Sequence, residues 1–204
     1  MLFRSQMKID NSLPLEYKTE QNRLNILGFW IFLGAEVMLF ATLFATYFVL
    51  EHRTAGGPTG AEIFEITPVL IETILLLTSS FVIGLGVHAM RLGRKKAMMT
   101  FFAITLLLGL AFLGVEIYEF THYANIGAGL QVSAFTGILL TTLGTHGAHV
   151  TLGLFWGLFI ILQVKKHGLT PKTANKAFIF SLYWHFLDVV WIFIFSFVYL
   201  KGMM

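Results

Sequence analysis

Two apolar stretches of the chain each carry a pair of ionisable side chains three residues apart. His146 and His149 lie in the run LGTHGAHVTLGL, and His185 and Asp188 lie in the run SLYWHFLDVVWIF. Imidazole and carboxylate groups are common ligands of zinc and iron, so the sharpest chemistry open to these residues is to hold a metal ion or a haem. One such pair supplies too few ligands for an iron centre, and neither run contains an HExxH-like base. Ligand number therefore favours a structural role.

Residues three apart share one face of a helix, so each pair forms a single polar patch. A short connection joins the two stretches, which predicts antiparallel neighbouring helices in which Asp188 or His185 meets an imidazole of His146 or His149. Hydrogen bonds between transmembrane helices contribute roughly 0.6 kcal/mol each. We therefore interpret the four residues as a buried polar joint that fixes helix packing, without a metal.

Glu36 is a further candidate, because no basic residue stands near it in its own apolar run. A charge at the centre of a membrane helix costs about 2.5–3.5 kcal/mol on insertion scales, so this carboxyl must find a partner elsewhere or be protonated. As a functional group it could hold a lipid headgroup or relay protons. As a structural group it would be a neutral carboxyl hydrogen-bonded to a neighbouring helix, and both interpretations are open.

Other ionisable residues fall near the ends of apolar stretches. Glu116, Glu119 and His122 recur at every third position, and Glu72 is expected at a similar depth. Side chains at the ends of membrane helices can reach the headgroups, so we expect a solvated helix end here. His88 lies near the end of another apolar stretch.

The composition requires a membrane. Of the 204 residues 56% are hydrophobic and 12% are charged, which is too few charges to cover a soluble domain. The absence of cysteine excludes disulfides and thiolate metal sites. The net charge of +3 comes from short basic clusters between apolar runs, a sign of topology and not of nucleic-acid binding. Aromatic residues around His185, among them Phe180 and Trp184, are expected to face lipid or another subunit.

Five apolar segments reach the length of about 20 residues that a helix needs to cross a bilayer. They are residues 26–50, 67–92, 97–118, 134–164 and 177–200. The linkers between them are short and carry turn residues, which leaves no room for a second domain. The sequence thus predicts an all-α integral membrane protein, with a polar cytoplasmic arm at residues 1–25 and a domain of five transmembrane helices at residues 26–204.

The basic residues predict the orientation of these helices. Twelve of the 14 Lys and Arg residues precede the first segment, follow the second or follow the fourth, and all three places lie on one side. Arg53 and Lys201 lie on the other side. Because cytoplasmic loops carry the excess of Lys and Arg, the N-terminus is predicted to be cytoplasmic and the C-terminus external.

Four runs, in their order and spacing, resemble subunit III of the haem–copper terminal oxidases. They are GFWIFLGAEVMLFATLF, LGLAFLGVEIYEFTHY, GTHGAHVTLG and SLYWHFLDVVWIFIFSFVYLKG. The resemblance covers nearly all the chain from Asn25 onward, and the combination of HGxHVxxG with WHFxDVVW is highly specific. Within the family, the runs RLNILGFWIFLGAE, RTAGG and GLTPKT look most similar to subunit III of the aa3-type menaquinol oxidases of Gram-positive bacilli.

The resemblance implies a multi-pass subunit of a proton-translocating respiratory quinol oxidase in the bacterial plasma membrane, a complex that oxidises quinol and reduces oxygen to water. It implies that this chain binds no haem or copper and is not itself catalytic. Subunit I carries the haems, the copper and the proton channels. This chain would pack beside subunit I, with subunits II and IV in the same complex, and would support its stability and proton uptake.

The family's intramembrane carboxylate carries over to Glu36. The residues that match the family's lipid-lined cleft are Glu36, His88, Glu116, His146, His149, His185 and Asp188. Among them Glu36, His88 and Glu116 are the lipid-binding or proton-related candidates, and a bound phospholipid is expected. Full-length members have seven helices and this chain matches the last five, so one wall of the cleft would come from elsewhere, such as extra helices on subunit I.

Three alternatives stay open. The chain could be subunit III of a cytochrome c oxidase, because that group is closely related. It could be a stand-alone membrane metalloenzyme that uses His146, His149 and His185. It could also be a small transporter, although the sequence has no internal repeat or pair of broken helices.

Overall fold

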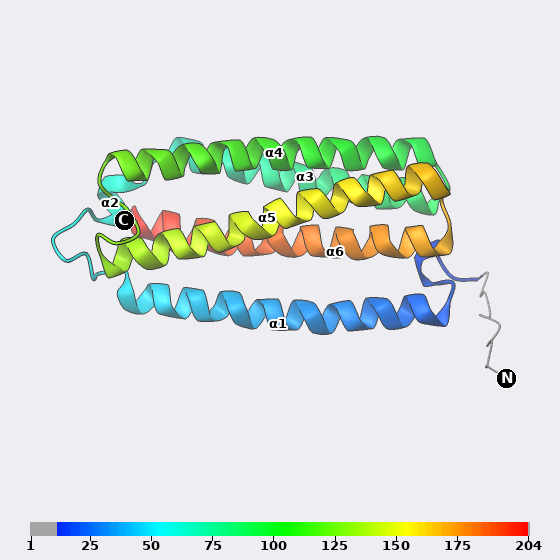
Figure 1. Cartoon of the computed structure of the whole chain (residues 1–204), viewed down its shortest axis with the longest axis horizontal. Coiled ribbons are helices and arrows are strands. Elements are labelled where there is room, and N and C mark those ends of the chain that lie inside the picture. The colour runs from blue at the N-terminus through cyan, green and yellow to red at the C-terminus, as the bar shows by residue number, and fades with distance from the viewer. Residues whose placement is uncertain (1–11, 204) are drawn as a thin grey trace.

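Five long helices run side by side in the computed structural model, which describes residues 12–203 (Figure 1). They are α1 (Glu20–Leu50), α3 (Ile66–Arg91), α4 (Lys95–Asn125), α5 (Ala134–His167) and α6 (Pro171–Ile194). A π-helical segment, η2 (Phe195–Leu200), continues α6, while a 3-10 turn, η1 (Leu15–Tyr17), and the short helix α2 (Gly60–Ile63) complete the described chain. Each long helix is long and apolar enough to cross a membrane. The predicted all-α fold with five transmembrane helices is confirmed.

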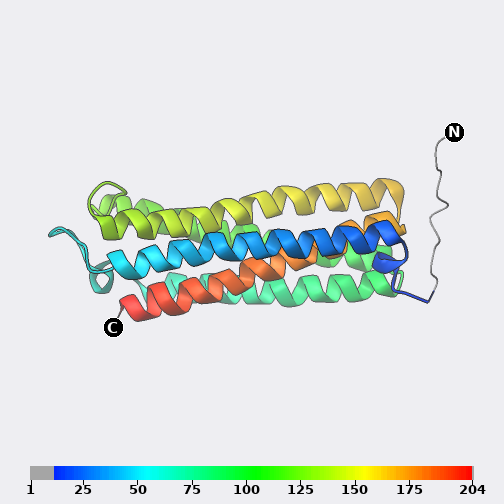
Figure 2. The ribbon, with the colours of Figure 1, turned by 90° about the horizontal axis from the view of Figure 1, so that it is seen from below.

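The helices alternate in direction, and this gives the bundle two distinct ends (Figures 1 and 2). We call the end at which α1, α4 and α6 begin the N end, and the end at which α3 and α5 begin the C end. Residues 1–11 of the predicted polar arm lie outside the described residues.

Capping groups and buried side chains set the helix ends, and these differ from the ends of the apolar runs. The Thr19 hydroxyl accepts a hydrogen bond from the Asn22 N–H at 3.2 Å, and α1 begins at Glu20 and not at residue 26. Thr170 caps α6, which begins at Pro171 and not at residue 177. At the C end, α4 continues to Asn125, past the predicted residue 118, because its last turns still bury side chains in the bundle.

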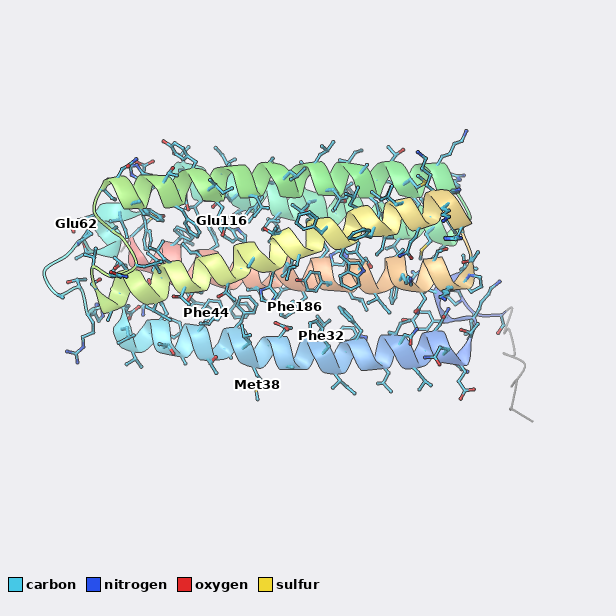
Figure 3. The ribbon with its side chains drawn as sticks, viewed as in Figure 1. Phe32, Met38, Phe44, Glu62, Glu116 and Phe186 are labelled. Carbon is cyan, nitrogen blue, oxygen red and sulfur yellow. The ribbon has the colours of Figure 1, made fainter. Side chains whose placement is uncertain are left out.

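Helix α6 lies at the centre of the bundle, where it packs against α1, α3 and α5, and α4 packs against α3 and α5. Helix α1 lies at the edge and packs against α5 and α6. It does so through one row of buried side chains spaced seven residues apart: Ile26, Leu33, Phe40 and Tyr47. The other faces of α1 expose large apolar side chains, and Figure 3 shows Met38 pointing away from the bundle. These faces are left for lipid or for a neighbouring protein.

The prediction that the aromatic residues around His185 face lipid or another subunit is wrong for Phe180 and Trp184, which are fully buried. A buried indole needs an acceptor for its N–H. The Trp184 indole donates to the Ser79 hydroxyl at 2.9 Å, and the Trp191 indole donates to the Thr73 hydroxyl at 3.0 Å. Helix α3 therefore supplies the acceptors that allow two tryptophans of α6 to pack inside the bundle.

The segment before α1 is fixed at the N end by one partly buried ion pair. Arg91 Nε donates to Glu16 Oε1 at 2.8 Å, and the Glu16 side chain is fully buried. The Asn175 side-chain amide of α6 also donates to the Glu16 carbonyl, at 3.1 Å. The start of the chain is thereby tied to the last turn of α3 and to the first turns of α6.

We expect the substitution Arg91→Met to release this segment, because it leaves the Glu16 carboxylate buried without its cation. Limited proteolysis in detergent should then show faster tryptic cleavage after Lys18. Arg94→Met is the matched control, since Arg94 is exposed and forms no ion pair with a described residue. Equal cleavage rates in the two variants would show that the ion pair does not hold the segment.

Candidate functional site

Glu36 of α1 finds its partner on α5. The Nε2 atom of His149 lies 3.1 Å from Glu36 Oε2, and the two side chains are 17% and 14% exposed. Aromatic rings surround the pair, with the Phe40 ring centroid 5.3 Å from that of His149. In Figure 3, Phe32, Phe44 and Phe186 project into the space between α1 and α6. The lone carboxyl predicted from the sequence is thus one half of an interhelical pair.

Both ring nitrogens of His149 take part in hydrogen bonds. Nδ1 of His149 lies 2.7 Å from the Thr145 carbonyl, which can only accept, so Nδ1 carries a hydrogen. Nε2 is then the nitrogen that shares a hydrogen bond with the Glu36 carboxyl. This interhelical partner lowers the cost of placing the carboxyl within the membrane.

His185 of α6 pairs with α3 and not with α5. Its Nδ1 lies 2.6 Å from the Ser80 hydroxyl. Asp188, one turn further along α6, also interacts with Ser80, while its Oδ1 has no hydrogen-bond partner among the described residues. The predicted contact of Asp188 or His185 with an imidazole of α5 is therefore wrong, because this face of α6 is turned toward α3. Helices α5 and α6 are joined instead by the Tyr183 hydroxyl, which donates to the His149 carbonyl at 3.0 Å.

His146 is fully buried in a nest of aromatic rings. Its ring centroid lies 5.4 Å from that of Trp191 and 5.8 Å from that of Phe112. Neither ring nitrogen has a hydrogen-bond partner among the described residues. His146, His149 and His185 do not come together as a metal or haem site. His146 is enclosed by aromatic rings, both ring nitrogens of His149 are in hydrogen bonds, and His185 pairs with Ser80 of α3. No group of three or more His, Cys, Asp or Glu side chains in the described chain could hold a metal ion.

The two remaining candidates lie apart from the Glu36–His149 pair. His88 is exposed in the last turns of α3, near the N end. Glu116 lies between α4 and α5 toward the C end (Figure 3). The prediction of a solvated helix end is wrong for Glu72, Glu116 and Glu119, which are all buried. Their faces of α3 and α4 turn into the bundle, and His122 alone of that set is partly exposed.

Sequence reasoning did not single out Ser79, Ser80 and Thr73, the α3 hydroxyls that pair with α6. A signal was present, because buried tryptophans require hydrogen-bond acceptors and these three hydroxyl side chains lie in a mainly apolar stretch. It could not be read as a contact without knowing that α3 is the neighbour of α6.

The fold and the paired residues define a multi-pass helical membrane protein whose ionisable side chains join its helices from within. Comparison with known proteins identifies the group. The sequence model of the cytochrome c oxidase subunit III family matches residues 15–203. The chain belongs to the cytochrome c oxidase subunit III family, and it is a subunit of a haem–copper oxidase complex.

The chain is also similar over its length to named bacterial proteins. It is 59% identical over 194 residues to quinol oxidase subunit 3 of Bacillus spizizenii, and equally to that of Bacillus subtilis, with 95% of each chain covered. It is 48% identical over 190 residues to the probable quinol oxidase subunit 3 of Staphylococcus aureus, covering 93% of this chain and 94% of the relative. The five apolar helices and these bacterial relatives place the protein in the plasma membrane.

Proposed function

We propose that this chain is the subunit III of a respiratory quinol oxidase, without redox centres of its own. The observation that carries the proposal is the 59% identity over 95% of both chains to quinol oxidase subunits. The enclosed His146 and the hydrogen-bonded His149 and His185 support the absence of haem and copper from this chain. Quinol oxidation and oxygen reduction then take place in another subunit.

The exposed apolar faces support a role in assembly. Helix α1 exposes Trp30, Ile31 and Met38, and α4 exposes Leu107 and Leu110. Surfaces of this kind in a membrane protein are covered by lipid or by another transmembrane chain. Subunit I, which holds the haems and copper, is the partner that packs here, and subunits II and IV complete the complex.

The charge distribution supports a cytoplasmic N end. In the described chain the basic residues gather at that end of the bundle, in the turn after α3 and around the turn between α5 and α6. Among them are Arg91, Arg94, Lys95, Lys96, Lys165, Lys166, Lys172 and Lys176. Following the positive-inside rule, the N-terminus is cytoplasmic and the C-terminus external.

Glu36 is the candidate for lipid binding within this subunit. Its carboxyl and the His149 ring are partly exposed between aromatic side chains of α1 and α6. This setting suits the polar part of a phospholipid whose acyl chains lie against the rings. His88, exposed near the N end, is placed to contact headgroups at the membrane surface.

The electron donor is tested by purifying the complex through a tag on this chain and measuring oxygen consumption. We expect rapid consumption with a menaquinol or ubiquinol analogue and none with reduced cytochrome c. The alternative, a cytochrome c oxidase subunit III, is favoured by the description of the matching family. Oxidation of cytochrome c without oxidation of quinol would establish that alternative.

We expect Glu36→Ala to leave the initial rate of oxygen reduction within about twofold of the unchanged complex, because no redox chemistry passes through this chain. The substitution removes the partner of His149 Nε2, so bound phospholipid should decrease and the active lifetime during turnover should shorten. Both are measured on the purified complex, by lipid mass spectrometry and by the decay of oxygen consumption.

Glu20→Ala is the matched control, since Glu20 is an exposed glutamate at the start of the same helix. It should change neither lipid content nor lifetime. Immediate loss of all turnover in an assembled Glu36→Ala complex would contradict the supporting role.

A further inference from the structure

Five polar side chains meet inside the bundle toward its C end, apart from the Glu36–His149 pair. Three are carboxyls, which we call the carboxyl cluster: Glu72 of α3 with Glu116 and Glu119 of α4. The other two are Tyr123 of α4 and Tyr199 of η2. All five are buried, and Glu72 is 0% exposed.

The contacts of these side chains show that they form one group. The Tyr199 hydroxyl donates to Glu119 Oε2 at 2.7 Å. Glu72 interacts electrostatically with Glu119 and Glu116, and Tyr123 interacts with Glu119 and Tyr199. On the α5 side Gly147 makes room for Glu116, since a Cβ at that position would lie 2.7 Å from Glu116 Oε1. The cluster is thus enclosed by α3, α4, α5 and η2.

No cation of the described chain neutralises this cluster. None of the ion pairs among residues 12–203 includes Glu72, Glu116 or Glu119. Both Glu72 oxygens and Glu116 Oε1 lack hydrogen-bond partners in the same part of the chain. The nearby His146 of α5 packs its ring against Phe112 and Trp191.

Unpartnered groups of this kind indicate a ligand. Removing an ionised carboxylate from water costs several kcal/mol unless a partner compensates, and neighbouring carboxylates add mutual repulsion. A proton neutralises a carboxylate without needing a cavity for an ion. It also converts one acceptor oxygen into a hydrogen-bond donor, which a set of acceptors such as Glu72 and Glu116 lacks.

A small cavity lies between the cluster and exposed side chains at the C end. It has a volume of about 10 Å³, and Glu119 and Tyr123 line it together with Glu65 and His122. A cavity needs roughly 10–15 Å³ to hold one water molecule. At the rim the His122 Nε2 lies 3.9 Å from Glu65 Oε1, with the two side chains 36% and 62% exposed. Imidazole exchanges protons with water near neutral pH.

We propose that the carboxyl cluster is a proton-binding site that is filled from the C end of the bundle through His122, Glu65 and the cavity beneath them. A proton from bulk water binds to His122 or Glu65 and passes through one water to the Glu119 carboxylate, which becomes a carboxylic acid. The proton is then shared with Glu116 and Glu72. The site is separate from Glu36, and it does not depend on which electron donor the complex uses.

The protonation state is tested by infrared spectroscopy on the purified oxidase complex. We expect the unchanged complex to show a C=O stretch of protonated carboxyl groups that loses intensity in Glu72→Gln. Glu62→Gln is the control, because Glu62 is exposed at the same end and hydrogen bonds from Thr59 lower the pKa of its carboxyl. Its spectrum should keep the whole band.

Tyr123→Phe is a milder substitution that keeps the proposal testable if a glutamine variant does not fold, since it removes only a hydroxyl group that interacts with Glu119. The substitution should shift the C=O band. The proposal is overturned if the band is unchanged in Tyr123→Phe and in every glutamine variant that assembles. It is also overturned if the cluster is ionised and a monovalent metal cation copurifies with it.

The path is tested by transfer of the complex into deuterated water. The C=O band shifts when its proton is replaced by deuterium, so the rate of the shift reports access to the cluster. We expect His122→Gln to slow the shift at least threefold and His52→Gln, at an exposed position of the same end, to leave it unchanged. Equal rates in the two variants would exclude the route past His122.

Discussion

The substitution Trp191→Ala should destabilise the subunit by about 3–5 kcal/mol, as is typical when a buried aromatic side chain is truncated to alanine. Trp191 is fully buried at the contact of α3, α4, α5 and α6. Its ring packs at centroid distances of 4.8 Å from Phe112, 5.4 Å from His146 and 6.1 Å from Tyr199. The substitution opens a cavity among these rings. It also removes the indole N–H that donates a hydrogen bond to the Thr73 hydroxyl.

The effect is measured by denaturant unfolding of the detergent-solubilised complex, with the loss of this subunit from the complex as the signal. Phe81→Ala is the control, because Phe81 lies on the outward face of α3 and is 68% exposed. It should change the free energy of unfolding by less than about 1 kcal/mol, as expected for a side chain that leaves no internal cavity. A Trp191→Ala variant with the stability of the control would contradict the packing described for α6.

Adding a side chain at Gly109 of α4 should destabilise the subunit nearly as much as Trp191→Ala does. A Cβ at Gly109 would lie 2.7 Å from a ring carbon of the buried Trp184 and 2.9 Å from Leu154 Cδ2. Trp184 cannot move far, because its indole N–H donates a hydrogen bond to the Ser79 hydroxyl. We therefore expect Gly109→Val to cost at least the roughly 1–3 kcal/mol that overpacking usually costs and to reduce the amount of assembled complex.

Gly114→Val is the matched control, since Gly114 lies on the same helix and a Cβ added there would have no heavy atom of the described chain within 4 Å. The amount of subunit retained in the purified complex, compared between the two variants, gives the measurement. If Gly109→Val is retained as well as Gly114→Val, α4 does not approach α6 as closely as the structure indicates.

The transmembrane helices could be predicted because the length of an apolar run is a local property of the sequence. The helix ends could not be read from the same runs. Thr19, Thr170 and Pro171 are capping residues outside the apolar segments, and they extend α1 and α6 beyond them. The capping signals were present in the sequence, but hydropathy does not register them.

The pairing of side chains was harder to predict, because it depends on the rotation of each helix about its axis. His185 and Asp188 share one face, as expected, but that face meets Ser80 of α3 and not the histidines of α5. Glu36 and His149 are 113 residues apart in the chain. Their pairing follows only from the packing of α1 on α5.

The carboxyl cluster shows both what the sequence predicts locally and what depends on the packing of the helices. Glu116, Glu119 and Tyr123 follow a helical spacing that places them on one face, which the sequence alone reveals. Whether that face meets water or protein depends on Glu72 of α3 and Tyr199 of η2, which approach it only in the folded bundle.

We propose that this chain is a structural subunit and that the haems and copper of the complex are bound by another chain. The most direct measurement is an optical spectrum of the purified complex, followed by spectra of the two fractions after this subunit has been removed with a stronger detergent. We expect the haem absorption to stay entirely with the remaining subunits, and the separated chain to show no Soret band and no stoichiometric copper. Haem or copper bound to the separated chain would contradict it.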